Sequence, residues 1–227
     1  MLRRSASLVL LATLSACAAS AAERSFPVTG FDKVSAAGSE DVVITTGKAA
    51  SVTASGPADV LDKLEVTVEG TTLKIRRKGN SWGWSNDKTV IRIAMPALHG
   101  LNLAGSGDVT ADKGSGPAFA AGLAGSGDLK IAQIDSPSVT ISTSGSGDIM
   151  AAGRCDAAKV SISGSGDIML AGLQCKTVDI GIAGSGDVSA YATQTANVRI
   201  SGSGDVKVSG GARCTSRTSG SGTVSCG

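Results

Sequence analysis

Gly105-Ser106-Gly107-Asp108 is the first of six identical tetrapeptides that divide the second half of the chain into nearly equal steps. The later copies begin at Gly125, Gly145, Gly164, Gly184 and Gly202, and a variant that ends in threonine begins at Gly220. The steps between successive copies are 20, 20, 19, 20, 18 and 18 residues. Such regular spacing is typical of a repeat protein in which each unit packs against its neighbours.

Aliphatic residues alternate with polar residues on both sides of the tetrapeptides. Val160-Ser-Ile162 precedes the copy at Gly164, and Ile168 follows the aspartate of that copy. A period of two predicts short strands with one buried face, and glycine permits a tight corner between them. The sequence therefore predicts an all-β, single-domain parallel β-helix or β-solenoid with coils of 18–20 residues and Gly-Ser-Gly-Asp corners. Right-handed coiling is the expected hand.

The first hundred residues carry the same pattern in a diluted form. We expect the domain to span residues 26–227, with irregular N-terminal coils over 26–100 and regular repeats over 101–227. Gly38-Ser-Glu-Asp41 resembles the later corners, and the 67 residues from Gly38 to Gly105 leave room for about three coils with longer loops. Residues 57–64 are expected to hold one short helical turn.

The composition disfavours several classes of protein. Only 3% of the residues are aromatic, so the core must be built from Val, Ile, Leu and Ala. The 21 basic and 19 acidic side chains give a net charge of +2, which provides no overall field for binding nucleic acid. The single histidine, His99, makes a histidine-based triad or a multi-histidine metal site hard to assemble. We place His99 in a surface turn and expect no cofactor.

The N-terminus is typical of an exported protein. Residues 1–4 are basic and residues 5–14 are apolar, a run too short to span a membrane, so we interpret residues 1–21 as a signal peptide. Residues 14–17 resemble the lipobox of a bacterial lipoprotein, with Cys17 as the acylated residue, while residues 19–21 also suit ordinary signal peptidase. Both outcomes predict the periplasm or the outer membrane and cell surface, with membrane contact only through a lipid anchor.

Four cysteines remain after residue 21, and an even number in an oxidising compartment predicts two disulfides. Cys155 and Cys175 lie one coil apart at similar offsets from their corners, which predicts a bond between them. Cys214 and Cys226 would then close the last coil. Free buried thiols are the alternative.

The corner aspartates form a predicted row of carboxylates with a spacing of about 5 Å. Our interpretation is structural, with each carboxylate accepting hydrogen bonds from nearby backbone N–H groups or from the corner serine. The alternative is a calcium site, since Ca²⁺ binds carboxylate and carbonyl oxygens. The aspartates concerned are Asp108, Asp128, Asp148, Asp167, Asp187 and Asp205.

One loop differs from the rest of the sequence in its concentration of basic and aromatic residues. It contains Arg76, Arg77, Lys78, Trp82 and Trp84 within a stretch rich in Gly, Asn and Ser. Exposed indoles beside cations can bind sugars or lipid headgroups. The alternative is a loop whose rings fold back and cover the solenoid.

The serial corners, Phe31-Asp-Lys-Val34, Leu73-Lys-Ile75 and residues 90–96 together resemble the "putative auto-transporter adhesin, head GIN domain" family. The resemblance covers about residues 26–210. It implies a β-helix-like fold and a cell-envelope location, and it brings no catalytic motif to carry over.

These observations predict an exported, non-catalytic envelope protein that acts as an adhesion, binding or scaffold module through its long faces. The expected partner is an envelope glycan, an envelope protein or a second copy of the chain. One alternative is a carbohydrate-active β-helix enzyme, although the acidic residues repeat identically and form no distinctive cluster. A purely structural spacer is the other alternative.

Overall fold

The computed structural model describes residues 22–79 and 88–227, which form a β-solenoid with one short helix. The strands of the N-terminal part are β1 (Ala22–Phe26), β2 (Lys33–Gly38), β3 (Asp41–Thr46), β4 (Ser51–Gly56), β5 (Leu64–Glu69), β6 (Thr72–Arg77) and β7 (Val90–Met95), and α1 is Ala58–Lys63. The regular coils contain β8 (Gly100–Gly105), β9 (Val109–Ser115), β10 (Ala118–Gly125), β11 (Leu129–Asp135), β12 (Ser138–Gly145), β13 (Ile149–Gly164), β14 (Ile168–Gly184), β15 (Val188–Gly202), β16 (Val206–Ser209), β17 (Arg213–Gly220) and β18 (Val224–Cys226).

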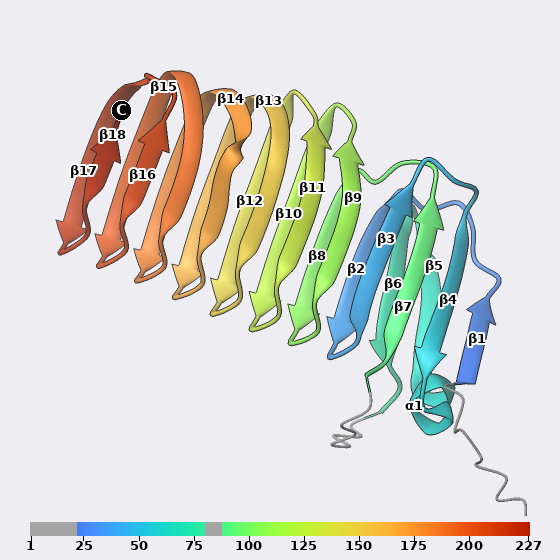
Figure 1. The fold of residues 1–227 in the computed structure, drawn as a ribbon. Helices are drawn as coiled ribbons and strands as arrows, with labels where there is room; N and C mark the ends of the chain where they lie inside the picture. Colours follow the sequence, from blue (N-terminus) through green and yellow to red (C-terminus); the bar gives the residue numbers. More distant parts are fainter. Residues whose placement is uncertain (1–21, 80–87) are drawn as a thin grey trace, which may run out of the picture.

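Two parallel sheets face each other across the core of the solenoid. The inbound sheet contains the strand segments that run into each corner, such as β8, β10 and β12, which pair in parallel with their corner glycines in register. The outbound sheet contains the segments that leave the corners, such as β9 and β11. The long strands β13, β14 and β15 contribute to both sheets, because each continues from its outbound segment through the far bend into the next inbound segment. Figure 1 shows the corners as a row along the lower edge of the solenoid.

Close stacking of successive corners explains why each corner from Gly105 onward has two glycines. Gly125 has a φ of +136°, and a Cβ at this position would lie 2.0 Å from the carbonyl oxygen of Gly105 in the preceding coil. A Cβ at Gly127 would lie 2.0 Å from the carbonyl oxygen of Gly107. The N–H groups of Ser126 and Gly127 donate to the carbonyl oxygen of Gly105 at 3.0 and 3.2 Å. The corners are therefore bonded to one another through their backbones, at a distance that excludes side chains from both glycine positions.

The core lies between the two sheets and consists mainly of Val, Ile, Leu and Ala, as the composition predicted. Val160 and Ile162 on the inbound sheet face Ile149 and Ile168 on the outbound sheet, and each of the four is at most 2% exposed. Burial of each such side chain contributes about 1.5–3 kcal/mol.

The N-terminal part corrects the prediction of about three further coils between Gly38 and Gly105. β2 and β3 stack directly on β8 and β9, so the corner at Gly38 is the immediate neighbour of the corner at Gly105. The intervening chain places β6 and β7 in parallel on the other side of β2 and β3. β4 then pairs antiparallel with β7, and β5 pairs antiparallel with β6, so both lie outside the coil stack.

Local sequence explains this reversal. A two-residue turn at Gly70 and Thr71, where Gly70 has a φ of +60°, joins β5 to β6 as a hairpin. The predicted helical turn at residues 57–64 is confirmed as α1, whose buried Val60 and Leu61 face the protein. The irregular segment therefore covers the N-terminal end of the solenoid.

Candidate binding surfaces

The corner aspartates form a continuous ladder of hydrogen bonds along the solenoid. One carboxylate oxygen of each aspartate accepts the backbone N–H of the aspartate in the next coil, at 2.7–3.2 Å. The ladder begins at Asp41 and ends at Thr223, whose N–H and hydroxyl both donate to Asp205 at 2.8 Å. These two hydrogen bonds, the backbone one first, hold the pKa of Asp205 below its ordinary value.

The sequence predicted that these carboxylates accept hydrogen bonds from nearby backbone N–H groups or from the corner serine, as in an Asx-type turn. They do accept backbone N–H groups, but the donor lies in the next coil, so the ladder joins coils instead of closing a local turn. The ladder spreads its carboxylates along a line. In the described ranges, 22–79 and 88–227, no three His, Cys, Asp or Glu side chains gather as a group that could hold a metal ion.

Both predicted disulfides are present. Cys155 and Cys175 are register partners on β13 and β14, with their Cα atoms 4.5 Å apart. Cys214 and Cys226 join β17 to β18 across the last coil, with a Cα separation of 6.5 Å. The first bond ties adjacent far bends together, and the second ties the two sheets together at the C-terminal end.

The arginines of the predicted interaction loop form ion pairs at the N-terminal end of the solenoid. Arg76 donates to Glu65 at 2.8 Å, and Arg77 donates to Glu40. Glu40 is 5% exposed and stands at the corner position that later coils give to glycine. The ion pair between Glu40 and Arg77 was not predicted from the sequence.

Of the other residues predicted for the interaction loop, the structure describes only Lys78. The backbone N–H of Lys78 donates to the carbonyl oxygen of Lys63 at 2.7 Å. Trp82 and Trp84 lie outside the described residues, as do Cys17 and the rest of residues 1–21, which we interpret from their sequence as a signal peptide. The sugar or lipid contact of the tryptophans and the acylation of Cys17 stay predictions.

His99 lies in the irregular segment just before β8, is partly exposed and has a specific partner. Its Nδ1 lies 3.2 Å from the Oδ2 of Asp32, and its backbone N–H donates to the carbonyl oxygen of Asp32 at 2.7 Å. Burial raises the pKa of Asp32, but hydrogen bonds from Thr71 and His99 outweigh burial and hold the pKa below its ordinary value. The pair fastens the start of β2 to the start of β8, where the two strands are far apart in sequence.

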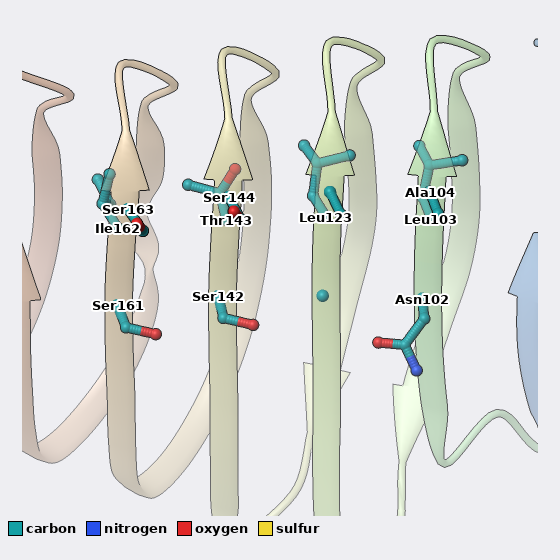
Figure 2. A pocket seen from close by; sticks show the side chains of 12 residues that line it. Asn102, Leu103, Ala104, Leu123, Ser142, Thr143, Ser144, Ser161, Ile162 and Ser163 are labelled. Carbon is teal, nitrogen blue, oxygen red and sulfur yellow. The ribbon is translucent and has the colours of Figure 1, made fainter. Parts of the chain in front are cut away.

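The outer surface of the inbound sheet carries a shallow groove of about 430 Å³ that runs across the strands. Its lining is uncharged and comes from four successive inbound segments, whose outward positions hold only Asn, Ala, Gly and Ser. Figure 2 shows Asn102 and Ser142 extending toward the strand between them, which carries Gly122. A Cβ at Gly122 would lie 2.5 Å from the Oδ1 of Asn102, so glycine keeps the floor of the groove open. Ser161 extends the hydroxyl-lined surface to the next strand.

The groove was not predicted as a site, although its signal is present in the sequence. The outward position three residues before the corner is occupied by Asn102, Gly122, Ser142, Ser161 and Gly181 in the five coils whose corners begin at Gly105 to Gly184. All five side chains are short and uncharged, unlike those on the neighbouring column, which includes Lys159 and Asp179. In the last two coils the outward position is Arg199 and then Arg217, so the uncharged column ends there. Identifying a groove required the register of the coils, which sets these positions side by side.

In the part of the chain that the structure describes, no helix has the length and apolarity that a membrane crossing requires. Comparison with curated proteins finds none that matches the chain. Several solved bacterial structures share its fold. A protein from Bacteroides fragilis, described as a putative adhesin, is 23% identical with a TM-score of 0.86, covering 91% of this chain and 96% of its own.

A protein from Parabacteroides distasonis, described as a putative lipid binding protein, is 26% identical with a TM-score of 0.73, covering 92% of this chain and 98% of its own. A putative adhesin from the same species is 17% identical with a TM-score of 0.70, covering 91% of this chain and 97% of its own. The family pattern itself matches residues 30–212, most of the chain. The chain therefore belongs to the family described as "putative auto-transporter adhesin, head GIN domain".

Proposed function

We propose that the chain is an exported, non-catalytic binding module of the bacterial envelope, and that it binds an extended partner along the groove of the inbound sheet. The observation that carries this proposal is the groove itself, because the parallel coils hold Asn102, Gly122, Ser142 and Ser161 at fixed positions side by side. A preorganised surface loses little conformational entropy on binding. The membership in an adhesin-named family supports the same function.

The arrangement of the carboxylates supports a non-catalytic module over a carbohydrate-active enzyme. A glycosidase needs two carboxyl groups in different environments, one as acid and one as base or nucleophile. The first five corner aspartates, Asp108 to Asp187, have equivalent contacts, since each accepts the N–H of the aspartate in the next coil. The two disulfides support export, because such bonds persist in oxidising compartments.

The test compares the wild-type chain, beginning at residue 22, with a variant that blocks the groove. Ser142→Arg places a long cation in the groove, and Thr110→Arg places the same side chain on the exposed outer face of β9 as the matched control. We expect the wild type and the control to be retained on envelope fractions or on a glycan array, and we expect Ser142→Arg to be released.

The same assay separates the alternatives. Depletion of a polysaccharide during incubation would favour the enzyme, and absence of retention on every surface would favour the spacer. Retention on lipid vesicles alone would favour the lipid binding named for the Parabacteroides distasonis protein. Equal retention of Ser142→Arg and wild type would refute the groove as the binding surface.

A further inference from the structure

A second concave site lies at the far bends, at the opposite end of the coils from the aspartate corners. It has a volume of about 400 Å³ and is lined by segments of four successive coils. Its lining includes Tyr191, the only tyrosine of the chain, together with Gln174, Thr193 and the Cys155–Cys175 disulfide. No residue of this site belongs to the groove of the inbound sheet.

The solenoid departs from its regular register at these bends. The pairing of β11 with β13 shifts between Ile131 and Ile134, and the pairing of β14 with β15 shifts on both sides of Cys175. The pairing of β13 with β14 shifts earlier in the strand, between Met150 and Ala152. The inbound pairings of β8, β10, β12 and β13 continue without a shift. Bulges of this kind re-aim side chains and are common beside functional sites. The regular register is therefore interrupted in the strands that contribute Gln174 and Tyr191 to the site.

The tyrosine ring is held in place by its neighbour in the next coil. A Cβ at Gly210 would lie 3.0 Å from Cε1 and from Cζ of Tyr191, so the ring packs against the glycine backbone. Tyr191 is the register partner of Gln174 in the preceding coil, which places an amide beside the ring. Both side chains are on the outer surface and line the concavity.

The charged groups of the site neutralise one another. Arg154 donates to both carboxylate oxygens of Asp135, at 3.0 and 3.1 Å, and Lys176 lies 2.8 Å from Asp156. Together these are two cations and two anions in two pairs, so the site has no net charge for an ionic ligand. The hydrogen bond from Arg154 holds the pKa of Asp135 below its ordinary value.

We propose that this site binds a neutral oligosaccharide that runs across the coils, with one sugar ring stacked on Tyr191. The hydroxyl groups of the oligosaccharide would bond to Gln174 on the neighbouring strand and, further along, to the Asp135–Arg154 pair. A pyranose presents C–H groups on its face and hydroxyls around its rim. An aromatic ring beside planar donors and acceptors matches both features, and such a combination is characteristic of small-ligand pockets. The site is separate from the groove, so it gives the envelope module a second point of attachment.

The single tyrosine makes a direct test available. In the chain beginning at residue 22, ring-labelled tyrosine gives NMR signals from Tyr191 alone. The probes are cellotetraose, maltotetraose and chitotetraose as neutral oligosaccharides, with a sulfated heparin fragment as the charged one. We expect at least one neutral probe to shift the tyrosine signals in a saturable manner and the heparin fragment to leave them unchanged. The proposal is wrong if no neutral probe shifts the signals, or if only the heparin fragment does.

Variants measured by calorimetry then locate the bound sugar. Tyr191→Ala is expected to weaken binding about tenfold or more, because it removes the stacking surface, whereas Tyr191→Phe keeps the ring and stays within about threefold of wild type. Gln174→Ala is expected to weaken binding by a similar factor through its lost hydrogen bonds. Ser142→Arg, which blocks the groove, should bind the sugar as wild type does. An unchanged affinity in Tyr191→Ala would overturn the proposal, while loss of envelope retention in Ser142→Arg alone bears only on the groove.

Discussion

Removing one carboxylate from the aspartate ladder tests how the coils hold together. In the Asp148→Ala variant, the backbone N–H of Asp167 loses an acceptor that lies at 2.7 Å. A hydrogen bond to a charged group contributes about 1.5–3 kcal/mol, and a buried donor without a partner costs about 1–3 kcal/mol. Because Asp148 and Asp167 are partly exposed, water can replace part of the lost bond. We therefore expect Asp148→Ala to lower the free energy of unfolding by about 1–2 kcal/mol.

Two further variants separate the hydrogen bond from the charge. Asp148→Asn keeps an acceptor oxygen and removes one negative charge from a row of like charges, so we expect a loss of less than about 1 kcal/mol. Asp156→Ala removes a carboxylate that is 58% exposed and paired with Lys176 on the surface. A surface pair of this kind contributes about 0–1 kcal/mol, which makes this variant the control for loss of any exposed aspartate.

Urea denaturation gives the free energy of unfolding, and amide hydrogen exchange reports the local bond. We expect the Asp167 amide to exchange faster in Asp148→Ala than in Asp148→Asn, even if the coils unfold in stages. An unchanged urea midpoint together with unchanged protection of the Asp167 amide in Asp148→Ala would refute the ladder as a source of stability. A chelator should leave the melting temperature unchanged. A rise in melting temperature with millimolar calcium that Asp148→Asn abolishes would instead identify the aspartates as calcium ligands.

Three other variants test the corners, the end of the ladder and the last coil. Gly127→Ala should destabilise the protein by about 3 kcal/mol in urea, because its Cβ would meet a backbone oxygen at 2.0 Å, whereas Gly181→Ala, with no atom within 4 Å, should be neutral. Thr223→Val removes the hydroxyl donor and should raise the NMR-measured pKa of Asp205 toward its ordinary value. In the wild type, the lowered pKa stabilises the fold at pH values above the unfolded-state pKa of this aspartate. This contribution disappears as the pH falls through the folded-state pKa. Reduction of the Cys214–Cys226 disulfide should speed amide exchange in β17 and β18 while leaving exchange in the central coils unchanged.

The regular coils could be predicted from sequence because each repeat packs the same positions against its neighbours. The spacing of the corners determines which residues become register partners, so Cys155 and Cys175 could be placed together before the structure was known. The same reasoning predicted the alternating strands and their buried positions, such as Val160 and Ile162. In a parallel stack, a fixed period along the chain becomes a fixed neighbour in space.

The N-terminal order and the binding surfaces could not be predicted in the same way. The corner at Gly38 stacks on the corner at Gly105, and no period links these two positions because the intervening chain lacks the repeat. The sequence predicted a nearby backbone or serine donor for each aspartate, but only the stacked backbones show that this donor is the N–H group of the next coil. The Tyr191 site depends on bulges, which break the period from which the prediction was made.

The two ends of the solenoid show how the sequence limits its length. Unpaired edge strands invite association with other strands, so a stack of coils needs protection at both ends. At the N-terminal end, β1, β4, β5 and α1 cover the coils. At the C-terminal end, the register positions that follow the buried Val198 and Ile200 are Ser216 and Thr218, which are exposed and too polar to begin another layer of core. The hydroxyl of Thr223 donates back to the preceding coil, so the last corner offers no carboxylate to a following coil. The carboxylate ladder and the apolar core column therefore both give way to hydroxyl side chains in the same coil.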